Sequence, residues 1–195
     1  MASSLPTLVS GLWQVLEHAG PTAMMIGLVG LTLLLEEVAV ALGAGLILSG
    51  ALSPAQAFVA LSFGIAVGDL GLYGLGSLAR RIKALRHRLG IERAERWRGA
   101  LHRRIVPAVL LARMVPGLRL PTYSGAGFLN VPFNAFAPAV LLSVLPWTAL
   151  LLFAGHTLIG WFERQFGMSP LAGALGLGGL VFAVSLIAGH LRARN

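Results

Sequence analysis

Five charged residues lie within or beside long apolar runs of this 195-residue chain. They are two adjacent glutamates, one aspartate and two arginines: Glu36, Glu37, Asp69, Arg113 and Arg119. On insertion scales, a charged side chain at the centre of a bilayer costs about 2.5–3.5 kcal/mol if it faces lipid alone. Acids and bases that meet in one cavity offset much of this cost by pairing. The set therefore predicts a polar site at membrane depth.

The two arginines bracket a helix-breaking pair, Pro116-Gly117. Six residues apart, Arg113 and Arg119 would lie on different faces of a straight helix. A break between them lets both point into one cavity. A guanidinium group stays charged whatever its surroundings and binds phosphate oxygens through two parallel hydrogen bonds. Two interpretations stay open: the arginines hold a phosphate group, or they pair with the acids and hold the chain's hairpins together.

The carboxylates predict charge pairing and, for one glutamate, ion coupling. Asp69 is the only aspartate in the chain and shares a helical face with Tyr73, four residues on. We expect it to pair with an arginine. A buried Glu36 or Glu37 beside an arginine could bind and release H⁺. Adjacent residues lie about 100° apart on a helix, so we do not expect both glutamates to face one cavity.

Other kinds of chemistry have no motif in this sequence. The chain has no cysteine, and its five histidines lack the spacing of metal ligands. His156, within an apolar run, is interpreted as a buried core histidine. There is no Ser/His/Asp order, Walker loop or dinucleotide fingerprint. We therefore expect no enzymatic activity, no metal and no cofactor.

The composition indicates an all-α, polytopic membrane protein. Hydrophobic residues make up 56% of the chain and charged residues only 11%, whereas a soluble domain is about 25% charged. The net charge of +8 is concentrated in residues 80–104, which hold ten Arg/Lys and two Glu. Between apolar spans, such a segment is typical of a cytoplasmic, amphipathic surface helix that meets anionic headgroups. Binding to nucleic acid is not expected.

The pattern along the chain predicts a single membrane domain over residues 1–195. A straight helix through residues 21–52 would exceed the ~20 residues that cross a bilayer, so we expect a break near the glutamates. Paired, broken apolar segments in the two halves indicate an inverted repeat. The predicted parts are an amphipathic start (1–20), a first half (21–78) with a re-entrant segment near 36–52, the basic segment (80–104), a second half (105–162) with a re-entrant segment near 106–130, and a terminal transmembrane helix (169–191).

The second half resembles the DedA family, whose domain is also called the VTT or SNARE-associated Golgi protein domain. The resemblance rests first on Arg113-x-x-Pro116-x-x-Arg119. It continues through Ala126-Gly127, Pro132-Phe133-x-x-Phe136, Trp147 and Gly155. In the first half, the glutamate pair and Gly68-Asp69-x-x-x-Tyr73 resemble the family's motifs in the same order. The family's usual second acidic residue has no counterpart in residues 41–45.

This resemblance implies two re-entrant hairpins that face each other in the membrane. It also implies transport or scrambling of phosphate-bearing lipids, such as undecaprenyl phosphate or phosphatidylethanolamine, with H⁺ or Na⁺ as the coupling ion, in a bacterial cytoplasmic membrane. The family's essential residues carry over to the arginines as phosphate ligands and to the three acids. The structural motif would comprise Tyr73, Pro116, Gly117, Gly125, Gly127 and Trp147. A small-ion antiporter, a non-transporting scaffold and a homo-oligomer stay open.

Overall fold

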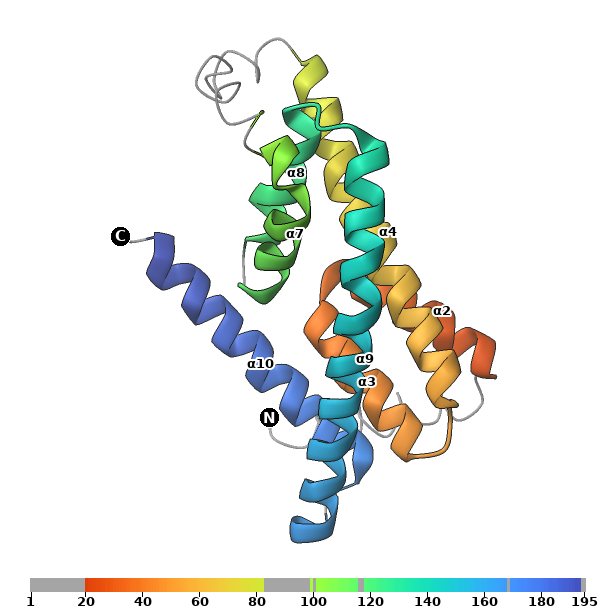
Figure 1. Ribbon diagram of the computed structural model, residues 1–195. Coiled ribbons are helices and arrows are strands. Elements are labelled where there is room, and N and C mark those ends of the chain that lie inside the picture. Colours follow the sequence, from red (N-terminus) through yellow and green to blue (C-terminus); the bar gives the residue numbers. More distant parts are fainter. Residues whose placement is uncertain (1–19, 83–98, 100, 116–117, 168, 194–195) are drawn as a thin grey trace. The chain divides into compact units, whose positions relative to one another are not determined.

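The computed structural model describes residues 20–82, 99, 101–115, 118–167 and 169–193. Every regular element in these ranges is an α-helix, as the sequence predicted (Figure 1). The predicted amphipathic start, except for Gly20, and most of the basic segment at 80–104 lie outside the described residues. In chain order the helices are α2 (Pro21–Leu34), α3 (Glu36–Leu48), α4 (Pro54–Arg81), α7 (Ile105–Met114), α8 (Arg119–Phe128), α9 (Phe133–Phe166) and α10 (Pro170–Ala193).

The chain forms two compact units. The first comprises Met1–Gly64 and Leu150–Gly179, and the second comprises Ile65–Ala149 and Leu180–Asn195. The first unit therefore holds α2 and α3, and the second holds α7 and α8. Helices α4, α9 and α10 each contribute to both units.

Helices α4 and α9 are long and apolar enough to cross a membrane. Their 28 and 34 residues correspond to about 42 and 51 Å, against a hydrocarbon core of about 30 Å. α4 starts with a capping box, because the amide of Ser53 donates to Gln56 Oε1 (2.9 Å) and the amide of Gln56 donates to Ser53 Oγ (3.3 Å). Pro54 then occupies the first turn, where its missing N–H costs nothing.

Large apolar side chains are exposed along both long helices. In a soluble protein, contiguous apolar surface of this kind would mark a binding site or an aggregation liability. Lipid is the solvent that such a surface requires. The exposed side chains include Val59, Phe63, Val67, Leu75 and Leu78 on α4, and Leu141, Leu142, Leu145, Leu150, Phe153 and Leu158 on α9.

A break at Leu35 separates α2 from α3, immediately before the two glutamates. Leu35 has φ −141° and ψ 79°, which lies outside the helical region. The two helices pack against each other in the first unit and follow one another in red and orange (Figure 1). With 14 and 13 residues they are about 21 and 20 Å long, less than the hydrocarbon thickness.

Small residues let α3 pack closely within the first unit. A Cβ added to Gly45 would lie 2.8 Å from Ala174 Cβ on α10, and one added to Gly43 would lie 2.8 Å from Leu61 Cδ1 on α4. Ala39 and Ala44 are fully buried. In a membrane, where lipid is as apolar as a side chain, close contact at small residues supplies much of the energy of helix association.

In the second unit, α8 packs against both α7 and α4. α7 and α8, drawn in green, form a pair of short helices of ten residues each (Figure 1). A Cβ added to Gly76 on α4 would overlap the backbone of Ser124 on α8. The core of this unit is aromatic, because among the side chains that the structure describes, Tyr123 and Phe136 are the largest that are fully buried.

Candidate functional site

Asp69 lies at the centre of a cluster of three charged side chains in the second unit. Its carboxylate is completely buried. The Nη2 group of Arg113 donates to Asp69 Oδ2, and the Nη2 group of Arg119 donates to Asp69 Oδ1 at 2.8 Å. Each carboxylate oxygen therefore accepts a hydrogen bond from a different arginine. The cluster carries a formal charge of +1.

The interruption between α7 and α8 brings the two arginines to one carboxylate. α7 ends at Met114, so Arg113 occupies its last turn, and α8 begins at Arg119. A positive charge in the last turn of α7 is favourable because the helix dipole is negative there. Pro116 and Gly117, which the sequence predicted as the break, lie outside the described residues.

The two arginines differ in how far they reach the surface. The Arg113 side chain is 2% exposed, whereas that of Arg119 is 26% exposed. Arg113 therefore lies at the buried end of the cluster and Arg119 at its rim. A buried ion pair of this kind is a costly feature that proteins keep where a partner, a register or a function requires it.

Tyr123 is a buried polar residue beside the cluster that the sequence analysis missed. Its hydroxyl donates to the backbone carbonyl of Val109 on α7 at 3.4 Å. The phenol oxygen also accepts a hydrogen bond from Arg113, and the charges of Asp69 and Arg119 act on the phenol as well. The signal that could have found it is its position on α8, four residues after Arg119 and hence on the same helical face.

Tyr73, the other tyrosine of the chain, attaches α4 to the segment that follows α8. Its hydroxyl donates to the carbonyl of Val131 at 2.7 Å. Its ring stacks on Phe136 with a centroid distance of 4.8 Å, and Tyr123 contacts the same ring edge-on at 5.5 Å. Phe136 therefore joins the two tyrosines through one aromatic core.

The two glutamates belong to the first unit. Glu36 is 8% exposed, whereas Glu37 is half-buried. Both lie in the first turn of α3, where the helix dipole favours negative charge. The difference in burial follows from the ~100° between adjacent helical residues, and it points to Glu36 as the glutamate that faces the protein interior. Their predicted roles in pairing and ion coupling stay predictions.

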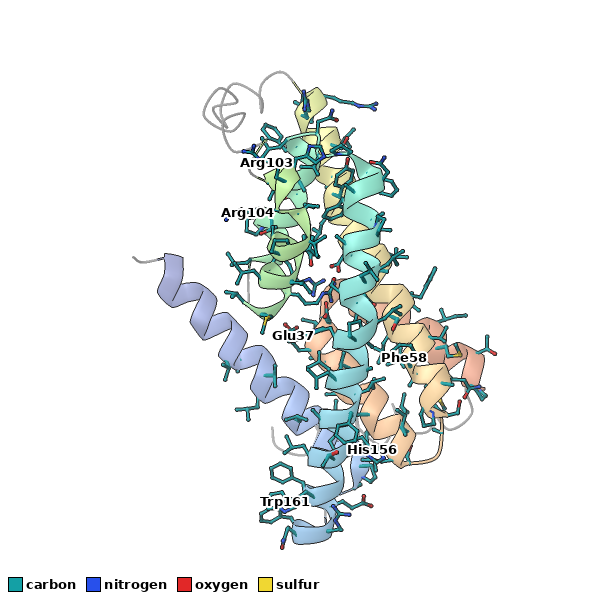
Figure 2. The ribbon with its side chains drawn as sticks, in the orientation of Figure 1. Glu37, Phe58, Arg103, Arg104, His156 and Trp161 are labelled. Carbon is teal, nitrogen blue, oxygen red and sulfur yellow. The ribbon has the colours of Figure 1, made fainter. Side chains whose placement is uncertain are left out.

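The other predicted motif residues have different surroundings. Gly127 lies against the backbone of α4, whereas a Cβ added to Gly125 would meet nothing within 4 Å. Trp147 is half-buried on α9. The interpretation of His156 as a core histidine is wrong, because its side chain is exposed on α9, in the same half of the helix as Trp161 (Figure 2). Gly155 is buried, and His156, the next residue, lies on a different face of α9 that is exposed.

The comparison with family models agrees with the motifs found in the sequence. The model of the VTT domain, the DedA family domain, matches residues 36–157. That range includes Glu36, Asp69 and both arginines and covers more than half of the chain. No curated protein and no solved structure matched the chain. The chain belongs to the DedA (VTT-domain) family, and with its apolar helices it is a membrane protein.

Proposed function

We propose that this protein moves phosphate-bearing lipids, such as undecaprenyl phosphate or a phospholipid, across a bacterial cytoplasmic membrane. The observation that carries the proposal is the convergence of Arg113 and Arg119 on the Asp69 carboxylate. A lipid phosphate is also an oxyanion, and guanidinium groups bind phosphate as readily as carboxylate. The phosphate can therefore replace Asp69 at both arginines.

The different exposure of the arginines supports an order of binding. A phosphate group would meet Arg119 first, because the side chain of Arg119 is 26% exposed and that of Arg113 is 2% exposed. Asp69 would neutralise the arginines while no lipid is bound. The acyl chains of the lipid can stay in the bilayer throughout, because the exposed surfaces of α4 and α9 are apolar.

The short helices support a re-entrant arrangement. α2, α3, α7 and α8 have 10 to 14 residues each, so none reaches the ~20 that cross a bilayer. In our proposal each pair enters and leaves the membrane on one side, and the two pairs are inverted repeats. Interrupted helices of this kind place charged groups near the middle of the membrane in other transporters.

We also propose that Glu36 couples lipid movement to H⁺ or Na⁺. Its burial next to a helix break supports this assignment over Glu37, which is half-buried. A carboxylate in a protein interior is a group whose charge can change with each transport cycle, since the neutral form is also tolerated there. The proposal for Glu36 is separate from that for the arginines, and either can fail alone.

Translocation in proteoliposomes tests the proposal for the arginines. We expect Arg119→Ala and Arg113→Ala to abolish transbilayer movement of a fluorescent phospholipid. Arg164→Ala is the matched control, because Arg164 is an exposed arginine on α9. Circular dichroism and gel filtration would show that each variant is folded. Wild-type translocation by a folded Arg119→Ala protein would contradict the assignment.

A charge-swapped variant separates transport from a purely structural ion pair. In Asp69→Arg combined with Arg119→Asp, the opposite charges can still meet. If the arginines only hold the helices together, the swap would restore the activity lost in Arg119→Asp alone. In a phosphate site, the swap leaves the variant inactive, because the arginine now comes from a different helix.

A further inference from the structure

The Tyr123 side chain lies one helical turn from Arg119, and its hydrogen-bond acceptor lies one helical turn from Arg113. On α8, Tyr123 lies one helical turn after Arg119. On α7, its hydrogen-bond acceptor Val109 lies one helical turn before Arg113. The side chain is completely buried, so its hydroxyl lies between the two short helices and not in solvent.

The hydrogen bond that the Tyr123 hydroxyl donates is long and easily exchanged. At 3.4 Å it is longer than the 2.5–3.0 Å of ordinary O–H···O hydrogen bonds. In a regular α-helix, the carbonyl of Val109 also accepts the amide of Arg113. The carbonyl therefore keeps a donor when the phenol turns away. The hydroxyl can change partner without leaving a buried acceptor unpaired.

The charged groups around the Tyr123 phenol indicate which acceptor its hydroxyl would bind after it leaves Val109. Its oxygen accepts a hydrogen bond from Arg113, and the charges of Asp69 and Arg119 also act on it, so the O–H remains available to donate to an anion at the arginines. Asp69 has two oxygens, and each already accepts a hydrogen bond from one arginine. A phosphate group that replaces this carboxylate brings further oxygens at tetrahedral angles. These oxygens can accept further hydrogen bonds beyond the two that Asp69 accepts.

We propose that the Tyr123 hydroxyl is a third donor to the bound phosphate group, and that it turns from Val109 to a phosphate oxygen when the anion displaces Asp69. This inference rests on the proposed function, since it assumes that the arginines bind phosphate. Tyr123 adds a hydrogen bond without adding charge. The aromatic contact with Phe136 holds its ring in place while the hydroxyl changes partner.

The chain has two tyrosines, and together they provide a matched pair of variants. We would titrate dioctanoyl phosphatidic acid into the purified full-length protein in detergent and measure affinity by calorimetry. Tyr123→Phe keeps the ring and removes the hydroxyl, and we expect it to weaken binding about tenfold or more, as for a lost hydrogen bond to a charged group. Tyr73→Phe removes the shorter 2.7 Å bond to Val131. It should lower the melting temperature and leave the affinity unchanged.

The possible results separate this inference from the proposed function. If Arg119→Ala abolishes binding but Tyr123→Phe binds like wild type, the inference is wrong and the phosphate site stands. If Arg119→Ala binds like wild type, the proposed function itself fails. Equal weakening by both tyrosine variants would show that the phenol acts through packing, which also overturns the inference.

A ¹⁹F NMR measurement tests the inference on protein that keeps Tyr123, so it does not require the Tyr123→Phe variant to fold. Protein labelled with 3-fluorotyrosine gives two ¹⁹F resonances, and their assignment comes from Tyr73→Phe, in which only the Tyr123 signal remains. We expect phosphatidic acid to shift the Tyr123 resonance and to leave that of Tyr73 in place. An unmoved Tyr123 resonance at saturating lipid would overturn the inference.

Discussion

Gly127 on α8 lies directly against the main-chain carbonyl of Tyr73 on α4, with no room for a Cβ between them. The hydroxyl of the same tyrosine donates to Val131, just beyond the end of α8. Tyr73 therefore holds α8 through both its backbone and its side chain. Arg119 lies at the other end of the same helix, two turns from this contact.

Gly127→Ala should destabilise the protein. The added Cβ would overlap backbone atoms, which cannot rotate away as a side chain can, so α8 must move from α4. Overpacking of this kind costs about 1–3 kcal/mol. Gly125→Ala is the control on the same helix, because its Cβ would meet nothing within 4 Å. It should be neutral or stabilising by up to ~1 kcal/mol through helix propensity. Melting temperatures in detergent would show the difference, and equal values would contradict it.

Asp69→Asn should make the stability of the protein depend on phosphate. Removal of one partner from a buried ion pair takes away negative charge that offsets the arginines and costs about 3–5 kcal/mol. A bound anion can take the place of the lost carboxylate. We therefore expect phosphatidic acid to raise the melting temperature of Asp69→Asn more than that of wild type. Glu163→Gln, an exposed acid on α9, serves as the control. An equal rise in all three proteins would contradict this explanation.

Glu36→Gln should uncouple ion movement from lipid movement, whereas Glu37→Gln should not. Glutamine keeps the shape of the side chain but cannot carry a proton or bind Na⁺ as an anion. The two residues are adjacent at the start of α3 and differ in burial, so they form a natural pair (Glu37 is labelled in Figure 2). A pH-sensitive dye inside proteoliposomes would report H⁺ flux during lipid movement, and a matched Na⁺ gradient would test the other ion. Equal flux in both variants would argue against Glu36.

Single cysteines should label in pairs if both helical hairpins are re-entrant. The chain has no cysteine of its own, so each introduced thiol gives the whole signal. Thr22 and Ala55 flank the α2–α3 pair, Arg104 and Asn134 flank the α7–α8 pair, and all four are exposed. With a membrane-impermeant maleimide, Arg104→Cys and Asn134→Cys should react from the cytoplasmic side. Thr22→Cys and Ala55→Cys should both react from the other side.

Reaction of the two members of a pair from opposite sides would show that the intervening segment crosses the membrane. That result would contradict the re-entrant arrangement for that pair. It would not affect the prediction for the other pair, because the two are labelled separately.

Local features of the structure were largely predictable from the sequence. The break before Glu36 and the interruption between Arg113 and Arg119 depend on residues close in the chain, where charge and proline chemistry act directly. The contact between Asp69 and both arginines was harder to predict from the sequence. Helical periodicity shows which residues share a face of a helix, but it does not show which other helix packs against that face.

Two side chains show where reasoning from the sequence stopped. Tyr123 was missed because a tyrosine in an apolar helix is usually part of the core, and only the packing of α7 against α8 brings its hydroxyl near the arginines. His156 was placed in the core because its neighbours are apolar. In a membrane protein, apolar neighbours mark a lipid-facing surface as well as a buried one, so composition alone could not separate the two.

Because each oxygen of Asp69 is held by its own arginine, the cluster can be opened in two stages. In the proposed function, the more exposed Arg119 would release its oxygen first while Arg113 still holds the other, so that a phosphate group would bind the two arginines in succession. Only one ion pair would then be exchanged at a time. A site with one arginine and one acid would have no intermediate in which one of two ion pairs is kept.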